Sequence, residues 1–243
     1  MHRLLVDSAS LELDAPVLSE AAAKHLRVVR PRDGEEIELF DGRGGWRVYA
    51  AVKDDGRWGL RSRSEVFRLR PPAFDLVLFA CVTKGSRWDW TVEKATELGV
   101  TRIVPVISER TIVRIPAADR AAKRDRWRRI AEDAARQSDA KWLPEILAPV
   151  DFAEALELVK RTRCFVGALT DPPPRMFLDE LAGSPVPFAG GAVFVGPEGD
   201  FTPEELRALT AAATPVSFGP TVLRAETAAI FGVSVLAAFA ATR

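Results

Sequence analysis

The apolar positions of this chain follow two different patterns, and the change lies near residue 70. Before it, residues 36–40 (EIELF) alternate at period two, and residues 46–50 return after a glycine-rich turn, as expected for an antiparallel strand pair. A short helix fits ahead of these strands, with Ser19 as its N-cap. Short strands with tight turns predict a small β-barrel or sandwich over residues 1–70.

Beyond the paired prolines Pro71 and Pro72, the apolar runs become nearly continuous, which is typical of strands buried on both faces. Such runs occupy residues 74–82, 102–107, 163–169, 191–195 and 214–218. Helical spacing of apolar residues occupies residues 88–98, 119–137 and 225–241. Strands that alternate with helices predict an α/β domain with a largely parallel sheet over residues 73–243.

Composition narrows the class of protein. Of the 243 residues, 47% are hydrophobic and 28% are charged, which supports a packed core and excludes disorder of the whole chain. No apolar run approaches the roughly 20 residues of a membrane span, and Asp7 comes too early for a signal-peptide core. Cys81 and Cys164 lie inside apolar runs, so we expect buried, reduced thiols and a cytoplasmic protein.

The charges sum to zero but are unevenly distributed. The first 150 residues carry 27 basic and 23 acidic side chains, and the remaining residues carry 7 and 11. Of the 34 basic residues, 27 are arginine, which suits bidentate phosphate contacts but follows equally from genomic base composition. Charge alone therefore permits a nucleic-acid partner without requiring one.

The most informative segment for ligand binding is the loop over residues 195–202. A buried strand leads into this glycine-rich loop, and the loop leads into a helix with Thr202 as N-cap and Glu205 completing a capping box. Ligands bind at such carboxyl ends of strands in α/β sheets. Glu198 and Asp200 would repel a phosphate, so the loop favours a ligand with positive charge. An ordinary turn with acids near a helix start is the alternative.

Two further strand-to-helix loops carry charged residues. The loop before the last helix places Arg224 and Glu226 at the mouth of a very apolar segment, where such charges are either paired with each other or used. Residues 83–90 place Lys84 and Arg87 beside two tryptophans, which suits contact with an RNA backbone and stacking on a base. A helix cap with tryptophans in the core is the alternative for this loop.

Other chemistries find no support in the residue spacing. The two histidines and the two cysteines have no zinc-ligand spacing, so no metal is expected. No Gly-x-Ser-x-Gly motif and no Cys/His pairing marks a nucleophile. Arg120, Arg124 and Arg128 share one face of the long predicted helix, which is either a solvated face or an RNA contact.

Six segments, taken together and in order, carry a resemblance to a known family. They are residues 25–30 with Gly34, residues 84–99, Pro105 with Glu109 and Arg110, Trp127 with Gln137, Ser138 and Pro144, residues 196–199, and residues 223–228. Over nearly the whole chain they resemble the bacterial 16S ribosomal RNA uridine N3-methyltransferases, ribosomal RNA small subunit methyltransferase E. The resemblance implies a PUA-like RNA-binding β-barrel over residues 1–70. It also implies a SPOUT methyltransferase domain over residues 73–243, an α/β domain whose C-terminal part threads a trefoil knot.

The resemblance further implies S-adenosylmethionine as cofactor, 16S rRNA or the small ribosomal subunit as substrate, and specific site residues. The cofactor carries a sulfonium and an ammonium and no phosphate, which accounts for the acidic loop. The implied cofactor-binding residues are Leu169, Thr170, Val195, Gly196, Pro197, Glu198, Gly199, Phe218, Gly219, Val222, Leu223 and Ala225. The implied RNA-binding residues are His25, Arg27, Arg30, Lys84, Arg87, Arg110 and Gln137. Arg224 is expected to stabilise the developing uracil anion, and Glu226 to orient that arginine or to assist proton removal.

Two positions depart from the family pattern. After residues 137–138 the family usually has Gly-Arg or Arg-Arg, whereas here Asp139 and Ala140 stand, with Lys141 as a partial substitute for the missing guanidinium. Thr221 stands where many members have arginine. These departures leave two alternatives open, namely a catalytically weakened ribosome-associated RNA-binding factor and a related SPOUT methyltransferase that acts on another RNA.

Two expectations concern the oligomeric state and the separate roles of the two domains. The resemblance implies a homodimer in which the paired domains complete each active site. The C-terminal helix carries more apolar faces than one sheet covers, so part of it is expected to face that partner, with burial inside one subunit as the alternative. The basic groups of residues 25–30 and 61–63 suit a phosphate-bearing strand. Residues 1–70 are therefore expected to supply RNA affinity and to contribute little to cofactor binding.

Overall fold

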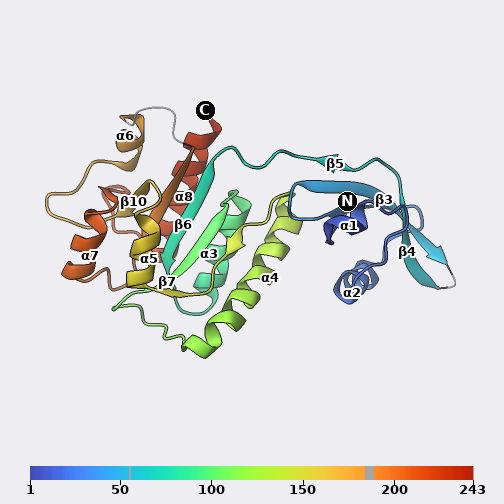
Figure 1. Cartoon of the computed structure of the whole chain (residues 1–243), viewed down its shortest axis with the longest axis horizontal. Coiled ribbons are helices and arrows are strands. Elements are labelled where there is room, and N and C mark those ends of the chain that lie inside the picture. Colours follow the sequence, from blue (N-terminus) through green and yellow to red (C-terminus); the bar gives the residue numbers. More distant parts are fainter. Residues whose placement is uncertain (55, 184–188, 243) are drawn as a thin grey trace. The chain divides into compact units, whose positions relative to one another are not determined.

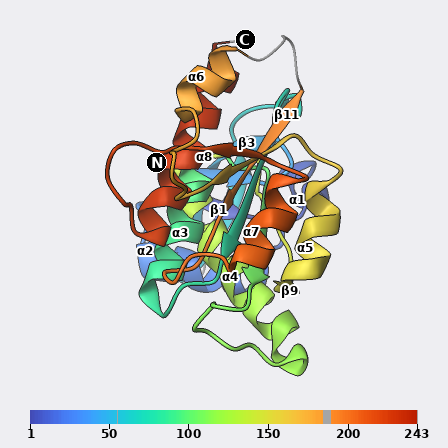
Figure 2. The same cartoon turned by 90° about the vertical axis from the view of Figure 1, so that its left-hand side faces the viewer.

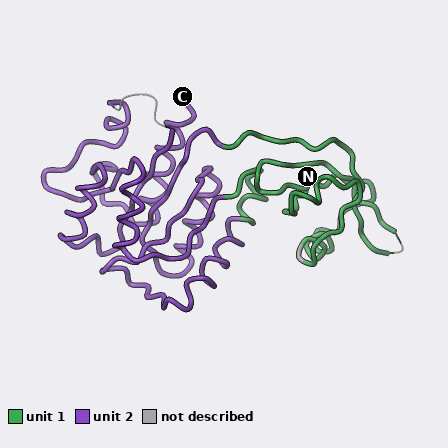
Figure 3. Tube along the Cα trace, in the orientation of Figure 1, with its two compact units in different colours: residues 1–71, 132–143 green, residues 72–131, 144–243 purple. Residues whose placement is uncertain are grey.

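The computed structural model describes residues 1–54, 56–183 and 189–242, and the chain divides into two compact units (Figure 3). The first unit contains Met1–Pro71 together with Glu132–Leu143, which we call the middle segment. The second unit contains Pro72–Ala131 and Pro144–Arg243. The sequence indicates the break near residue 71, but nothing in it indicates that the middle segment packs with the first unit.

The first unit is built on a five-stranded sheet. Its strands are β1 (His2–Leu5), β2 (Glu36–Phe40), β3 (Gly45–Asp54), β4 (Arg57–Ser62) and β5 (Phe67–Arg68), and its helices are α1 (Ser8–Leu11) and α2 (Glu20–Val29). β1 pairs parallel with β2, and the other pairs are antiparallel. The predicted strand over residues 36–40 is confirmed, as is the N-cap, because the Ser19 hydroxyl accepts a hydrogen bond from the Ala22 N–H at 3.3 Å.

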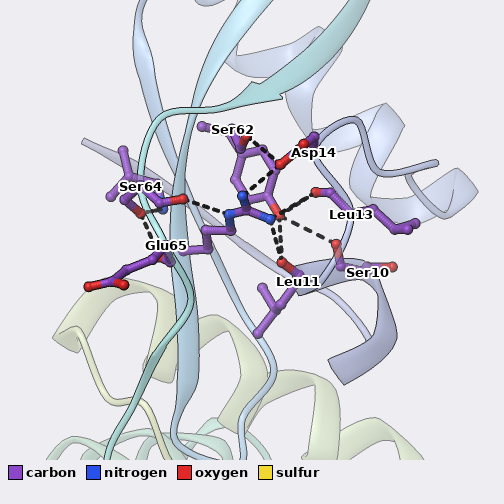
Figure 4. A network of polar contacts seen from close by, with 10 residues as sticks. Ser10, Leu11, Leu13, Asp14, Ser62, Ser64 and Glu65 are labelled. Atoms are coloured by element: carbon purple, nitrogen blue, oxygen red, sulfur yellow. Dashed lines mark hydrogen bonds and ion pairs between the residues drawn. The ribbon is translucent and has the colours of Figure 1, made fainter.

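A polar network fastens the loop after α1 to this sheet (Figure 4). The Tyr49 hydroxyl donates to the Leu11 carbonyl at 3.1 Å. The Arg47 guanidinium donates to the Ser64 carbonyl at 2.8 Å and to the Asp14 carboxylate at 2.7 Å. The carbonyl groups of an irregular loop need such donors, so this network stabilises the unit.

The middle segment is held in the first unit by charge and by backbone hydrogen bonds. The Lys141 ammonium pairs with the carboxylates of Glu38 and Asp139 and lies 5.0 Å from the Trp46 ring centroid. The Lys141 side chain is 9% exposed and that of Glu38 is 4% exposed. The Gly44 N–H donates to the Lys141 carbonyl at 2.9 Å. Lys141 therefore neutralises a buried carboxylate, and the expectation that it substitutes for an RNA-facing guanidinium is wrong.

The second unit contains a seven-stranded sheet in which every pair is parallel, so the predicted α/β class is confirmed. The strand order is β12-β10-β11-β6-β7-β8, with β9 also pairing with β7. The strands are β6 (Asp75–Cys81), β7 (Arg102–Ile107), β8 (Glu145–Ile146), β9 (Val150–Asp151), β10 (Cys164–Gly167), β11 (Gly190–Val195) and β12 (Thr214–Val216). The two-residue strands β8 and β9 are too short to leave a periodic signal in the sequence.

Helices cover both faces of this sheet (Figure 1, Figure 2). Helices α3 (Ser86–Glu97), α4 (Arg120–Ser138, after the 3-10 turn Ala117–Asp119), α6 (Phe177–Ala182) and α8 (Ala225–Ala241) pack on one face, and α5 (Phe152–Val159) and α7 (Pro203–Thr210) pack on the other. The three long predicted helices are confirmed, whereas the short α5 and α6 were not predicted. Among the described residues, no helix combines the length and apolar character needed to cross a membrane. The trefoil knot stays a prediction.

Several core residues match the expectations from the sequence. Trp88 is buried and packs edge-on against Trp127 with ring centroids 5.3 Å apart, whereas Trp90 is exposed. Cys81 and Cys164 are buried and free. Burial raises the pKa of each thiol to about 12, so both thiols are protonated and unreactive at neutral pH. The expectation of buried, reduced thiols is confirmed.

Candidate active site

Three loops of the second unit meet at one edge of its sheet because their strands are neighbours. β12, β10 and β11 are adjacent and parallel, so their carboxyl ends lie together. A cavity of about 300 Å³ opens at these ends, a volume at the lower end of the range for small-molecule sites. We call it the strand-end cavity. Its lining residues are Gly167, Ala168, Leu169, Val195, Gly196, Pro197, Glu198, Asp200, Ser217, Phe218, Gly219, Thr221, Val222, Leu223, Arg224, Ala225 and Ala228.

The loop after β11 has the cap that the sequence predicts. The Thr202 hydroxyl accepts from the Glu205 N–H at 3.2 Å, and the Glu205 carboxylate accepts from the Thr202 N–H at 3.1 Å. The other carboxylate oxygen of the buried Glu205 accepts from the Glu109 N–H at 2.9 Å, which ties the loop after β7 to this loop. A Cβ atom at Gly196 would lie 3.0 Å from the Phe201 ring, so the glycine lets the loop pass close to that ring.

Two arginines expected to bind RNA contact this same loop. The Arg110 guanidinium donates to the Gly199 carbonyl at 3.1 Å and to the Phe201 carbonyl at 3.3 Å. The Arg87 guanidinium lies 3.4 Å from the Glu198 carboxylate. Both side chains therefore hold the loop that carries the acidic residues of the strand-end cavity. Lys84, the third cation expected in this region, is exposed.

The loop after β12 leads into α8 without a side-chain cap. Arg224 is the N-cap residue with extended backbone, φ −66° and ψ 152°, and its carbonyl accepts from the Ala228 N–H at 2.8 Å. No described side chain caps the first turn of α8, so its leading N–H groups are available to a ligand. A Cβ atom at Gly167 would lie 2.6 Å from the Phe218 ring, so only glycine allows this aromatic wall.

The two predicted catalytic residues are placed differently. Arg224 is exposed and lines the strand-end cavity. Glu226 does not line it, and its Oε2 atom is buried without a hydrogen-bond partner among the described residues. No ion pair joins Arg224 to Glu226 in the described part of the chain, so the interpretation as a structural pair is wrong. Burial of a carboxylate oxygen without a hydrogen-bond donor costs free energy, so Glu226 needs a donor that the described residues do not supply.

The structure brings together most of the predicted cofactor residues. All but Thr170 and Gly199 line the strand-end cavity. The Thr170 hydroxyl instead donates to the Pro172 carbonyl at 2.9 Å. The residues that sequence reasoning did not assign to the cofactor are Gly167, Ala168, Asp200, Ser217, Thr221, Arg224 and Ala228. Most are chain neighbours of assigned residues, and Ala228 lies one helical turn after Arg224, a spacing that could have identified it.

The lining of the strand-end cavity combines apolar walls with charge. Leu169, Val195 and Phe218 supply apolar surface, and Glu198 and Asp200 supply negative charge. The Asp200 carboxylate also accepts from the Phe201 N–H at 2.8 Å. Such a cavity suits a small organic molecule that carries positive charge, and it disfavours a phosphate group.

The remaining predicted RNA residues lie in the first unit. Arg27 and Arg30 are exposed at the C-terminal end of α2, where Arg30 has a left-handed backbone with φ 51°. His25 and Gln137 line a second cavity, which is described below. The arginine-rich face of α4 is largely neutralised, because Arg120 pairs with Asp151 at 2.6 Å and Arg124 with its neighbour Asp125 at 2.8 Å. A solvated face explains these arginines.

Two protein-family models match different parts of the chain. A family model described as RNA methyltransferase domain matches residues 70–237, and one described as RNA methyltransferase PUA domain matches residues 18–50. Ribosomal RNA small subunit methyltransferase E of Synechocystis is 33% identical over 238 residues, which cover 93% of this chain and 74% of the relative. The protein of that name from Mycobacterium bovis is 35% identical over 215 residues, with 83% and 78% covered.

Solved structures agree with this assignment. A methyltransferase of Legionella pneumophila in complex with its cofactor SAM aligns with a TM-score of 0.84 and 29% identity, covering 97% of this chain and 96% of that chain. Ribosomal RNA small subunit methyltransferase E of Neisseria gonorrhoeae, bound to S-adenosyl methionine, aligns with a TM-score of 0.83 and 27% identity, with the same coverage. The similarity extends over both units.

Proposed function

Because the chain belongs to the RNA methyltransferase family that includes ribosomal RNA small subunit methyltransferase E, we propose that it methylates N3 of a uridine in 16S rRNA with S-adenosylmethionine as the methyl donor. One observation carries the proposal beyond family membership. Three loops at adjacent strand ends enclose a cavity with apolar walls, two acidic residues and Arg224.

The residues of the strand-end cavity fit S-adenosylmethionine. Glu198 and Asp200 complement its positive groups, and the wall formed by Leu169 and Phe218 suits the adenine ring. The uncapped N–H groups at the start of α8 are donors for its polar atoms. When bound, this cofactor supplies a methyl group activated by the positive sulfur.

Residues of the chain itself would promote the reaction at the uracil base. The N3 atom of uracil carries a proton, so its methylation requires removal of that proton and stabilisation of the resulting anion. Arg224, exposed in the cavity lining, is the proposed group that stabilises negative charge on the uracil oxygens. Glu226 makes no ion pair with Arg224 and does not line the strand-end cavity, so neither of its two expected roles is carried into this proposal.

Mass spectrometry of nucleosides tests the proposed reaction. An unmethylated 16S rRNA transcript or small subunit is incubated with the protein and isotope-labelled S-adenosylmethionine, and the digest is expected to contain labelled N3-methyluridine. Label on a ribose hydroxyl, or on tRNA in place of 16S rRNA, would favour a related methyltransferase. An isothermal titration without heat from either S-adenosylmethionine or S-adenosylhomocysteine would favour an RNA-binding factor without catalysis.

We also propose a homodimer and action in the cytoplasm, where ribosomal subunits are available as substrate. The α8 surface alone does not require a dimer, because Val233, Val235 and Leu236 are buried within one chain. The support comes from the rim of the strand-end cavity, where Leu169 is 61% exposed and Val222 is 75% exposed. Light scattering that gives the mass of a monomer at micromolar concentration would contradict the dimer.

A further inference from the structure

A second cavity, of about 360 Å³, lies in the first unit and is lined by three segments that are far apart in the sequence. The lining includes His2 and Arg3 of β1, His25 of α2, and Asp133, Arg136 and Gln137 of α4. We call it the histidine cavity, because the two histidines of the chain both line it. The sequence resemblance assigns His25 and Gln137 to RNA binding, and the structure brings these two residues to one place.

The two arginines of the histidine cavity differ in how firmly they are held. Arg3 lies beside two carboxylates, with its Nε atom 3.3 Å from Glu38 and 3.0 Å from Asp139. Arg136 pairs with Asp133, one helical turn before it, whose side chain is 71% exposed. An ion pair with so exposed a carboxylate contributes at most about 1 kcal/mol. Arg136 can therefore exchange its partner for another anion, whereas Arg3 is fixed.

The surroundings of His25 disfavour its protonated form. Partial burial of the ring lowers the pKa of His25, and the charges of Arg136 and His2 lower it further, while Asp133 raises it. His2 itself faces the Glu35 carboxylate, with its Nε2 atom 3.6 Å away. An anion bound among these groups would favour the protonated imidazole, because opposite charge stabilises the charged form.

We propose that the histidine cavity binds one backbone phosphate of the substrate RNA, with Arg136 as the charged donor and with His2, His25 and Gln137 as further N–H donors. The inference rests on the proposed rRNA substrate and adds a contact made by the first unit. Guanidinium, imidazole and amide N–H groups are donors that phosphate oxygens accept from in RNA complexes. Asp133 competes with the phosphate for Arg136, so this contact is weaker than that of an unpaired arginine.

The two histidines make the site directly observable by NMR. The imidazole signals of the full-length protein come from His2 and His25 alone, and both rings line the cavity. Titration with inorganic phosphate is expected to shift both sets of signals and to raise the pKa of His25. The same titration of Arg136→Ala should leave the signals nearly unmoved. Imidazole signals of the wild-type protein that do not shift during the phosphate titration would overturn the proposal.

Binding of a 16S rRNA transcript is the second test. Arg136→Ala is expected to weaken binding about tenfold and to reduce the slope of log K against log salt by about 1. Asp133→Asn removes the competing carboxylate and should strengthen binding. Arg207→Ala is the matched control, because Arg207 forms the same i,i+3 pair with Glu204 on α7 and lines neither cavity.

The outcomes separate this inference from the proposed function. Wild-type protein that neither binds nor methylates the transcript contradicts the rRNA function and the phosphate site with it. Methylation by the wild-type protein, with unchanged affinity and salt slope in Arg136→Ala, contradicts the phosphate site alone. Phosphate-dependent shifts without any loss of RNA affinity in that variant would reveal an anion site that RNA does not use, which also overturns the proposal.

Discussion

The strand-end cavity and the histidine cavity are built in opposite ways. The strand-end cavity is formed by loops that follow adjacent parallel strands, and its shape depends on close backbone approach at Gly167 and Gly196. The histidine cavity is formed by charged and polar side chains from three segments that are distant in sequence. One site therefore depends on backbone geometry, and the other depends on the charges of long side chains.

This difference has a consequence for the two proposed ligands. The strand-end cavity is partly enclosed, so salt screens the attraction between its acidic residues and a cationic ligand less than it screens the attraction between exposed charges. Affinity for S-adenosylmethionine should therefore change little with salt, and affinity for RNA should fall steeply as neutralised phosphates regain counterions. The predictions below test this contrast, beginning with the largest expected effect.

Replacement of Arg224 tests whether the strand-end cavity separates chemistry from binding. Arg224→Ala is expected to lower the rate of methyl transfer about a hundredfold to a thousandfold, because the developing uracil anion loses its positive partner. Affinity for S-adenosylmethionine should stay within about threefold, since the apolar walls and the acidic residues of the cavity are unchanged. Single-turnover methylation and isothermal titration measure the two effects. Full activity of the variant would remove Arg224 from the mechanism.

Replacement of Glu38 tests how far the first unit depends on charge. Glu38→Gln leaves the Lys141 ammonium buried without its full partner, so the free energy of unfolding of the first unit should fall by about 3 kcal/mol. Hydrogen exchange of the full-length protein measures this loss for each unit separately. Glu36→Gln, at an exposed position of the same strand, is the matched control and should change stability by less than about 0.5 kcal/mol. Equal losses of unfolding free energy in the two variants would show that the buried pair of Glu38 and Lys141 stabilises the unit no more than an exposed charge does.

Replacement of Arg110 tests whether this side chain supports the loop of the strand-end cavity or contacts RNA. Arg110→Ala removes the hydrogen bonds to the Gly199 and Phe201 carbonyls, so affinity for S-adenosylmethionine should fall about tenfold. RNA affinity should stay within about twofold. Arg110→Lys keeps one donor and is expected to restore part of the cofactor affinity. Weaker RNA binding with unchanged cofactor affinity would return Arg110 to the RNA contact that the resemblance implies.

Removal of residues 1–70 has the smallest expected effect on the strand-end cavity. The fragment over residues 73–243 should bind S-adenosylmethionine within about threefold of the full chain, roughly 0.7 kcal/mol, while methylation of rRNA is lost. The middle segment loses its packing partner in this fragment, so helix α4 should fray back toward Ala131. Circular dichroism measures the fraying, and titration measures the affinity. A wild-type rate of methylation by the fragment would contradict the expectation that residues 1–70 supply the RNA affinity.

Much of the fold could be predicted because it depends on local patterns. The period-two run of residues 36–40 became β2, the continuous run of residues 102–107 became β7, and residues 225–241 became α8. The Thr202 and Glu205 capping box was also predictable, since both residues lie within one helical turn. Very short strands such as β1 and β8 escaped, because a few residues carry too little periodicity to separate strand, helix and loop.

The candidate site was predictable to the extent that its residues adjoin strand ends. The loops after β11 and β12 were recognisable from their residues, and the family resemblance added the loop after β10, so most residues of the strand-end cavity were assigned. The roles of particular charges could not be assigned, because a charged side chain acts according to its neighbour in space. Lys141 faces the buried Glu38, and Arg110 faces loop carbonyls, although both residues suit RNA contact by type alone.

By itself, the sequence determined the class of fold, the longer strands and helices, most of the loops that form the strand-end cavity and the family that the chain resembles. Tertiary structure alone decided that the middle segment packs with the first unit and that His2, His25 and Arg136 line one cavity. The physical reason is the range of the interactions. Helix caps and strand periodicity act between residues a few positions apart, whereas ion pairs and cavities join residues that meet only after the chain has folded.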